Sequence, residues 1–325
     1  MTETHRKRNR EIVECENHAL HRKDPKVSQF RYATRPSFQI QTNDQAIVIQ
    51  VLTIEDYIEP RRKEPKIRIH GVDAEGHAVT VVVHGFLPYF YVSPPLSMAS
   101  PQMLTDFLNK KLEQIRKPRW QQMERYVLGT RVDTKHTIQQ YNPQPQIFWR
   151  ITCTSPKIQP LLLRVIQDEL GIACFEANVQ YIYRFMIDHD MRGGGWIELP
   201  AFQYTYNTQT SQFHMFDDDI VVRNAINEIA PIYTLSFDIE CAKIKPGGFP
   251  SPRQDPVIQI ANYVTIYGQE EPIVRNIFVL HDCDPIEHAT IYTFADEREL
   301  LSEWRRFLQC INPGLVKFDI LSFFR

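Results

Sequence analysis

The sequence predicts an α+β domain over residues 45–230, followed by a smaller α/β domain over residues 231–325. Strand-like runs begin at Gln45, and a strand, a helix and another strand follow further along the same domain. After residue 231, three strand-like segments precede an amphipathic helix. This order favours sheets covered by helices, because each element has to bury its apolar face against another.

The composition is that of a globular protein. A chain of 325 residues with 43% hydrophobic and 23% charged residues has room for roughly two domains. It contains no apolar run of about 18 residues that would span a bilayer, and its N-terminus lacks the apolar segment of a secretory signal. We therefore expect no membrane partner. The formal charge of -2 gives no overall attraction to nucleic acid, so DNA contacts would come from local basic patches or metal-bridged phosphates.

Zinc chemistry is not supported. The six cysteines form no C-x-x-C pair, and the eleven histidines show no H-x-x-x-H spacing. Free, buried thiols are the favoured interpretation of the cysteines.

Residues 1–44 are polar and show neither helical nor strand periodicity, which predicts a disordered arm. The arm carries a basic cluster, Arg6, Lys7, Arg8 and Arg10. Such a cluster is equally compatible with a nuclear import signal and with a solvated tail.

The first domain opens with four strand-like runs, at residues 46–54, 66–72, 78–86 and 89–92, which predict an antiparallel layer. The aromatic run Pro88 to Tyr91 is either a stacking surface for single-stranded DNA, beside Arg61 to Lys63, or a packed strand, and the packed strand is favoured. Two helices are then expected to begin at Ser-Pro pairs, Ser100-Pro101 and Ser155-Pro156.

The second of these helices should end at Gly171. It lies between residues 147–153 and 178–187, both of which have the composition of strands. The polar stretch Asn207 to Asp219 is expected to connect to the next domain.

Two carboxylates share one face of a predicted strand at residues 233–240. Alternation points Leu235, Phe237 and Ile239 one way, and Asp238 and Glu240 the other. Residues at this spacing lie about 6 to 7 Å apart, within reach of a pair of Mg²⁺ ions. Such ions can hold an attacking water and a leaving 3′ oxygen on either side of a phosphodiester. By spacing alone, a solvated sheet edge is the commoner interpretation.

The neighbouring segments favour the metal site. An apolar strand at residues 257–264 and another near residues 276–280 follow, and then a helix opens with Asp296 and Glu299 in capping-box spacing. Three strands and a helix, with carboxylates on the first strand, are typical of the beginning of a ribonuclease H-like nuclease domain.

Several segments resemble one family. FDIECA at 237–242, FPSPRQDPVIQI at 249–260 and the Glu-Leu-Leu-x-x-Trp helix before NPGLV resemble the first exonuclease motif of the family B DNA polymerases, and within them the delta lineage. HGFLPYFYV at 84–92 and residues 175–200 resemble the N-terminal domain of that family. The resemblance covers roughly residues 45–316.

The resemblance implies that Asp238 and Glu240 are catalytic, metal-binding carboxylates of a 3′ to 5′ proofreading exonuclease with two Mg²⁺ ions. It further implies a single-stranded 3′ end of DNA as partner, accessory polymerase subunits as possible partners, and a location in the nucleus.

The chain departs from the family after NPGLV. The family continues with a strand and a YNxxNFD-like motif that supplies another metal ligand, whereas this chain has KFDILSFFR, and Asp319 follows Val316 too closely to be that ligand. We therefore expect an incomplete ribonuclease H-like exonuclease domain that lacks the strand beside residues 233–240 and holds two carboxylates in place of four. The polymerase motifs are also absent, so this chain should not synthesise DNA.

Three hypotheses follow. The chain is an N-terminal fragment of a polymerase, truncated within its exonuclease domain and inactive alone, or a truncated, non-catalytic isoform that binds DNA or a partner. The third, a small standalone nuclease, is least favoured because of the missing ligands.

Overall fold

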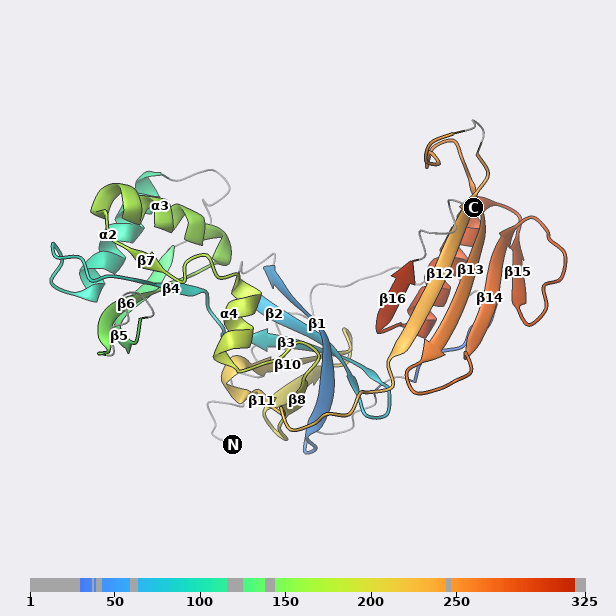
Figure 1. Cartoon of the computed structure of the whole chain (residues 1–325), viewed down its shortest axis with the longest axis horizontal. Coiled ribbons are helices and arrows are strands. Elements are labelled where there is room, and N and C mark those ends of the chain that lie inside the picture. Colours follow the sequence, from blue (N-terminus) through green and yellow to red (C-terminus); the bar gives the residue numbers. More distant parts are fainter. Residues whose placement is uncertain are drawn as a thin grey trace.

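The structure, a computed structural model, describes residues 30–36, 38, 43–58, 64–115, 125–137, 144–243 and 247–318. These residues form three β-sheets, of seven, four and five strands (Figure 1). The seven- and four-stranded sheets are built before residue 223, and the five-stranded sheet is built after residue 232.

The seven-stranded sheet has the order β11-β8-β1-β2-β3-β10-β9. Its strands are β1 (Ile47–Ile58), β2 (Pro65–Asp73), β3 (Ala78–His84), β8 (Trp196–Leu199), β9 (Tyr204–Asn207), β10 (Gln212–Phe216) and β11 (Val221–Val222). The first three strands are antiparallel neighbours, as predicted, whereas the fourth predicted run, residues 89–92, belongs to the four-stranded sheet. Their inward residues, among them Ile49, Ile67 and Val81, are fully buried in one core.

Helix α4 (Tyr181–Asp188) covers part of this core, so the prediction of a strand at residues 178–187 is wrong. Tyr181 and Phe185, one helical turn apart, pack on Phe86, and the Tyr181 hydroxyl donates to the Phe86 carbonyl at 2.6 Å. Aromatic and β-branched residues favour strands in isolation, but the i, i+4 spacing of the buried pair fits a helix.

Residues 207–219 do not form the expected connection. They contain the turn after β9, strand β10 and a 3-10 helix, η4 (Asp217–Asp219). The Asn207 side chain accepts hydrogen bonds from the N–H groups of Gln209 and Thr210, and Phe213 and Met215 enter the core. Two alternating apolar residues in a polar stretch are enough to make a strand when a buried neighbour, β3, is available for pairing.

The four-stranded sheet has the order β5-β6-β4-β7 and is covered by two helices. Its elements are β4 (Tyr89–Val92), α2 (Pro101–Gln114), β5 (Val127–Lys135), β6 (Gln146–Cys153), η3 (Pro156–Ile158), α3 (Gln159–Leu170) and β7 (Cys174–Phe175). Gly171 ends α3 in the left-handed region, as predicted. Phe90 is fully buried and its aromatic neighbours nearly so, which confirms the packed strand; Arg61, Arg62 and Lys63 lie outside the described residues.

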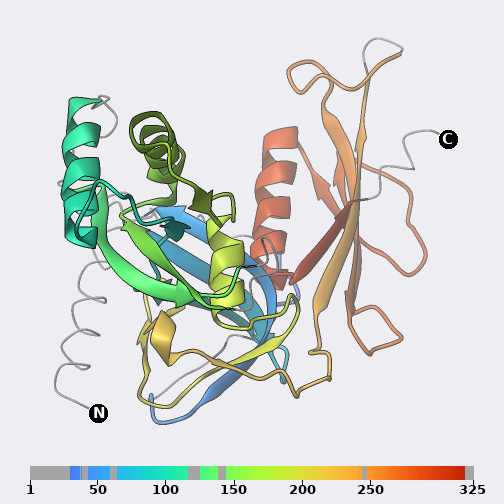
Figure 2. The same ribbon diagram turned by 60° about the vertical axis from the view of Figure 1, so that its left-hand side comes forward.

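The five-stranded sheet has the order β15-β14-β13-β12-β16. Its elements are β12 (Tyr233–Cys241), β13 (Val257–Ile266), β14 (Val274–Leu280), β15 (Thr290–Phe294), α5 (Glu297–Ile311) and β16 (Leu315–Phe318). Strands β12, β13 and β14 are antiparallel, while β15 is parallel to β14 and β16 is parallel to β12. Strand β15 was not predicted. Helix α5 lies along one face of the sheet (Figure 2) and buries Leu300, Phe307 and Ile311 there.

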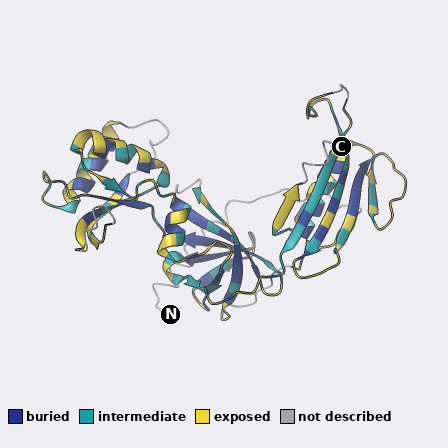
Figure 3. Ribbon diagram, viewed as in Figure 1, coloured by how far each residue is buried: buried dark blue, intermediate teal, exposed yellow. Residues whose placement is uncertain are grey.

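Strand β16 overturns the expectation that β12 lacks a partner on this side. It pairs with β12 from Thr234 opposite Leu315 to Phe237 opposite Phe318. The residues after NPG therefore supply the backbone ladder even though they depart from the family pattern. All four residues of β16 remain exposed (Figure 3), and Asp319 lies outside the described residues.

The expectation of a disordered arm is wrong for residues 30–36, which we call the strap. Phe30 and Tyr32 pack against the core between α5 and the five-stranded sheet, and Phe38, just beyond, packs against the core of the seven-stranded sheet. Isolated aromatic residues give no periodic signal, because here the order comes from contacts distant in sequence. The basic cluster at residues 6–10 lies outside the described residues.

Candidate metal site on strand β12

Strand β12 separates an apolar face from a polar one. Leu235 is fully buried against α5, and Tyr233, Phe237 and Ile239 pack against the same core. The pairing with β13 is regular up to Glu240 and shifts only between Glu240 and Cys241. Because side chains alternate along a regular strand, Asp238 and Glu240 both lie on the face turned away from α5.

The residues across the ladder from this acidic pair are uncharged. Asp238 lies opposite Ala261, and Glu240 lies opposite Gln259. Asp238 is partly buried and accepts a hydrogen bond from the N–H of Ile239 at 3.0 Å, whereas Glu240 is exposed. In the parallel pairing with β16, Lys317 lies beside Ser236, one step along the same face from Asp238. The face therefore offers two carboxylates that lie opposite small or neutral side chains, with Lys317 nearby.

Further carboxylates gather near the end of β12, but backbone groups already engage them. The pKa of the Cys241 thiol is raised by burial and also by the charges of Glu297, Glu240 and Asp255. Glu297 accepts from the N–H of Val257 at 2.8 Å, and Asp255 accepts from the N–H of Ser251 at 2.7 Å. Sequence reasoning missed both contacts; Asp255-Pro256 before a strand and Glu297 in the first turn of a helix are signals that could have indicated them.

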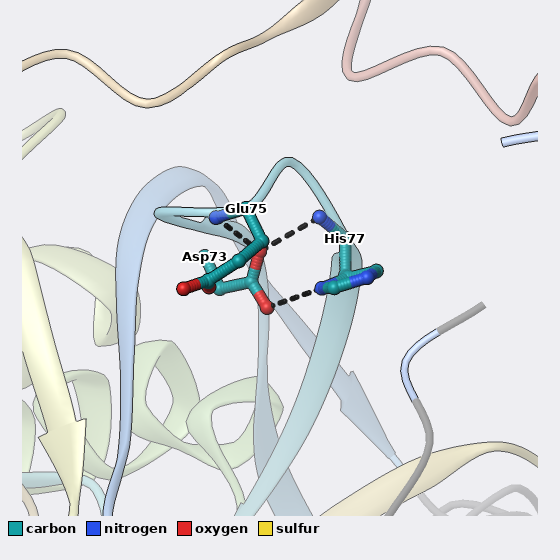
Figure 4. A group of neighbouring side chains, drawn as sticks. All are labelled: Asp73, Glu75 and His77. Atoms are coloured by element: carbon teal, nitrogen blue, oxygen red, sulfur yellow. Dashed lines mark hydrogen bonds and ion pairs between the residues drawn. The ribbon is translucent and has the colours of Figure 1, made fainter. Parts of the chain in front are cut away.

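A second group of possible ligands lies in the hairpin between β2 and β3. Ligand atoms of Asp73, Glu75 and His77 lie within 4.8 Å of one another (Figure 4). Asp73 accepts from the N–H groups of Glu75 at 3.1 Å and His77 at 2.7 Å, and its other oxygen lies 2.7 Å from His77 Nδ1. These bonds close the turn, so the group is explained as a hairpin cap. This group was not predicted from the sequence.

The cysteines do not form a site. Among the described residues, five cysteines are free, with Cys153 buried and Cys283 exposed, so the prediction of buried thiols is wrong for Cys283; Cys15 lies outside these residues. Burial raises the pKa of the Cys153 thiol to about 12, which keeps it protonated and unreactive at neutral pH.

Comparison with known proteins places the five-stranded sheet in a family. The family described as "DNA polymerase family B, exonuclease domain" matches residues 172–323, which include all of β12 to β16 and α5. The DNA polymerase delta catalytic subunit of Arabidopsis thaliana is 36% identical over 86% of this chain. The chain belongs to the family B DNA polymerases. The delta catalytic subunit of Schizosaccharomyces pombe is 33% identical over 93% of this chain.

A solved structure supports the fold. The family B DNA polymerase from the archaeon Pyrobaculum calidifontis aligns with this chain with a TM-score of 0.60, at 20% sequence identity. The alignment covers 86% of this chain and 31% of the archaeal chain. The chain spans 28% of the length of both delta relatives. No helix in the described part is long and apolar enough to cross a membrane.

Proposed function

We propose that this chain provides the N-terminal region and the first motif of the proofreading exonuclease of a delta-type replicative DNA polymerase. In this proposal Asp238 and Glu240 hold divalent metal ions during 3′ to 5′ hydrolysis of DNA. The observation that carries the proposal is the regular pairing of β12, which sets both carboxylates on the face away from α5. The family match over this sheet supports the same assignment.

The strand order supports a ribonuclease H-like interpretation of this sheet. Three antiparallel strands, β12, β13 and β14, are followed by a crossover through α5 to β16, which lies parallel to β12 at its free side. The acidic strand thus becomes interior to the sheet, and pairing on both sides fixes its backbone from Thr234 to Phe237, the segment next to Asp238. We propose residues 45–230 as the N-terminal domain and residues 231–325 as the exonuclease region, with the strap at residues 30–36 packed against the core of the latter.

The donor atoms on this face suit Mg²⁺, which prefers carboxylate oxygens and retains several waters. Bound Mg²⁺ would act as a Lewis acid toward phosphate oxygens. Asp238, partly buried and held through Ile239, would provide the fixed ligand, while exposed Glu240 can approach from solvent. Lys317 would contribute positive charge for the DNA backbone on the same face.

The proposed substrate is the single-stranded 3′ end of DNA, and the proposed location is the nucleus. The relatives named above are DNA polymerase catalytic subunits, which supports a DNA substrate. Accessory polymerase subunits are proposed as partners by the same resemblance.

We propose that the 325-residue chain alone hydrolyses DNA poorly. Two carboxylates hold metal ions weakly when the family uses four, and small misplacements of the attacking water cost much rate. The alternative role is non-catalytic binding of DNA or a partner; exposed apolar residues on β16, including Val316 at 53% and Phe318 at 45%, favour a protein partner there.

Metal binding tests the site independently of turnover. Mn²⁺ titration followed by electron paramagnetic resonance should show weak binding to wild type, lost in Asp238→Ala and retained in Asp284→Ala, an exposed carboxylate on the loop before β15. Equal binding by wild type and Asp238→Ala would overturn the site.

An exonuclease assay tests the activity of the chain. Magnesium-dependent removal of 3′ nucleotides from single-stranded DNA should be negligible for wild type and for Asp238→Ala. Strong activity that Asp238→Ala abolishes would support the site and overturn the proposal that two carboxylates are insufficient.

A further inference from the structure

Arg35 lies in the strap, where the seven-stranded sheet approaches the end of α5. Its backbone N–H donates to the carbonyl of Cys310 at 3.0 Å. Its guanidinium donates through Nε to Gly76 at 2.7 Å and through Nη1 to Asn312 at 2.8 Å. Arg35 therefore joins the β2–β3 hairpin to the end of α5, and it is only 7% exposed.

The charge of Arg35 is not paired with a carboxylate within salt-bridge distance among the described residues. Its guanidinium carbon lies 4.7 Å from the centre of the Tyr233 ring, and Nη2 has no hydrogen-bond partner among the residues that the structure describes. Burial lowers the pKa of Arg35, while Tyr233 and Asp73 raise it, yet arginine remains charged at neutral pH. A buried cation is costly unless it is paired, so this site favours an added negative charge.

Two cavities border Arg35. The larger has a volume of about 340 Å³ and the smaller about 270 Å³, and Ala78 and Asn312 line both. A water molecule takes about 30 Å³ of liquid volume, so the larger cavity has room for an anion of several atoms.

Several residues that line the larger cavity carry side chains that can donate hydrogen bonds. Besides Arg35, these come from Thr34, Tyr206, Ser211, Gln309 and Asn312. None of the described residues that line it is Asp or Glu. The smaller cavity is less suitable, because one of its lining residues, His70, lies 3.3 Å from the carboxylate of Glu55.

We propose that the larger cavity binds a small oxyanion, a phosphate or a carboxylate, through Arg35. Hydroxyl and amide groups would complete the coordination that one guanidinium cannot supply alone. Nη2 is itself shielded from solvent, so entry requires a small movement of neighbouring side chains. The bound anion would strengthen the contact between the strap, the β2–β3 hairpin and α5. This site is independent of Asp238 and Glu240.

Thermal unfolding of the whole chain tests the proposal. Inorganic phosphate, compared with chloride at equal ionic strength, should raise the melting temperature of wild type by about 2 to 3 °C at a tenfold excess over the dissociation constant. Acetate in place of phosphate distinguishes a carboxylate site from a phosphate site, and a shift with either anion supports the proposal.

Single substitutions test whether the rise in melting temperature comes from the cavity beside Arg35. Arg31→Gln removes an exposed cation from the same strap and should keep the full shift. Arg35→Gln and Ala78→Leu should lose it, the first by removing the charge and the second by filling the cavity while keeping Arg35. Hydrogen exchange at residues 30–36 reports whether the strap stays docked in each variant. The proposal fails if neither anion shifts wild type, or if Ala78→Leu with a docked strap keeps the full shift.

Discussion

The hydroxyl of Tyr32 donates a hydrogen bond to Glu303, with 3.0 Å between the two oxygens, and so ties the strap to α5. The ring lies among Phe278, Tyr292 and Phe307, at centroid distances of 5.3 to 5.8 Å. Burial and the Glu303 carboxylate both raise the pKa of Tyr32, which therefore stays protonated as a donor. The strap is consequently part of the core beneath α5.

Removing this contact should destabilise the five-stranded sheet. Tyr32→Phe should cost about 0.5 to 1.5 kcal/mol for the hydrogen bond, and Tyr32→Ala about 3 to 5 kcal/mol because it also leaves a cavity. Urea unfolding measures both, with Arg31→Ala, an exposed neighbour, as control. Equal stability of wild type and Tyr32→Ala would show that the strap is dispensable.

Ionisation of Asp217 should lower the free energy of unfolding as pH rises. Burial and the neighbouring Asp218 raise its pKa, although His189 opposes them. A carboxyl whose pKa is raised in the folded state favours folding when it is protonated. The loss of folding stability caused by its ionisation is therefore absent below its unfolded pKa, about 3.9. This loss of stability grows as pH rises from the unfolded pKa to the folded pKa, and above the folded pKa it stays constant.

Asp217→Asn should therefore be more stable than wild type at pH 7, and the difference should vanish below about pH 4. Chemical denaturation across this pH range measures it, with the exposed Asp284→Asn as control. A difference independent of pH would show that the effect is not ionisation of Asp217.

A side chain at Gly76 should destabilise the folded protein. Its φ of 89° is a conformation that disfavours L-residues, and an added Cβ would lie 3.2 Å from Pro231 Cγ. Its carbonyl also accepts the Nε bond of Arg35. Gly76→Ala should cost about 1 to 2 kcal/mol and increase hydrogen exchange in the strap. Gly193→Ala, where a Cβ meets nothing within 4 Å and φ is not positive, is the matched control.

The sequence was informative where a pattern is local and periodic. The alternation around Asp238, the cap at Gly171 and the antiparallel layer from Gln45 all depend on neighbours within a few residues. Asp296, for example, accepts from the N–H of Glu299 at 2.8 Å, as its spacing predicted. The site assignment itself stays a prediction, because paired carboxylates on a strand do not by themselves identify a metal.

What the sequence did not show depends on distant partners. Arg35 contacts residues 41 and 277 positions away, and no local pattern marks such a role. The aromatic composition of residues 178–187 favours a strand, but the i, i+4 spacing of Tyr181 and Phe185 fits the helix that forms there. Strand β16 was not expected because the departure from the family motif hid a backbone that still pairs.

A buried polar network links the middle of the five-stranded sheet to α5. Trp304 Nε1 donates to the Asn262 side-chain oxygen at 2.9 Å, and Asn262 Nδ2 donates to Asn276 at 3.0 Å. Asn262 is 4% exposed and Asn276 is 3% exposed, so water cannot replace these partners without rearrangement.

Asn262→Ala should lower the free energy of unfolding by more than the loss of side-chain volume alone would. It leaves the Trp304 N–H and the Asn276 oxygen without their partner, and each unsatisfied buried group costs about 1 to 3 kcal/mol. Thr265→Ala, on the same strand but the opposite face, should cost less. Denaturant unfolding followed by circular dichroism compares the two. Because α5 and β12 share this core, Asn262→Ala should also loosen the backbone that carries Asp238, and faster hydrogen exchange along β12 is the expected sign. Unchanged exchange there, despite lower stability, would show that the network holds α5 alone.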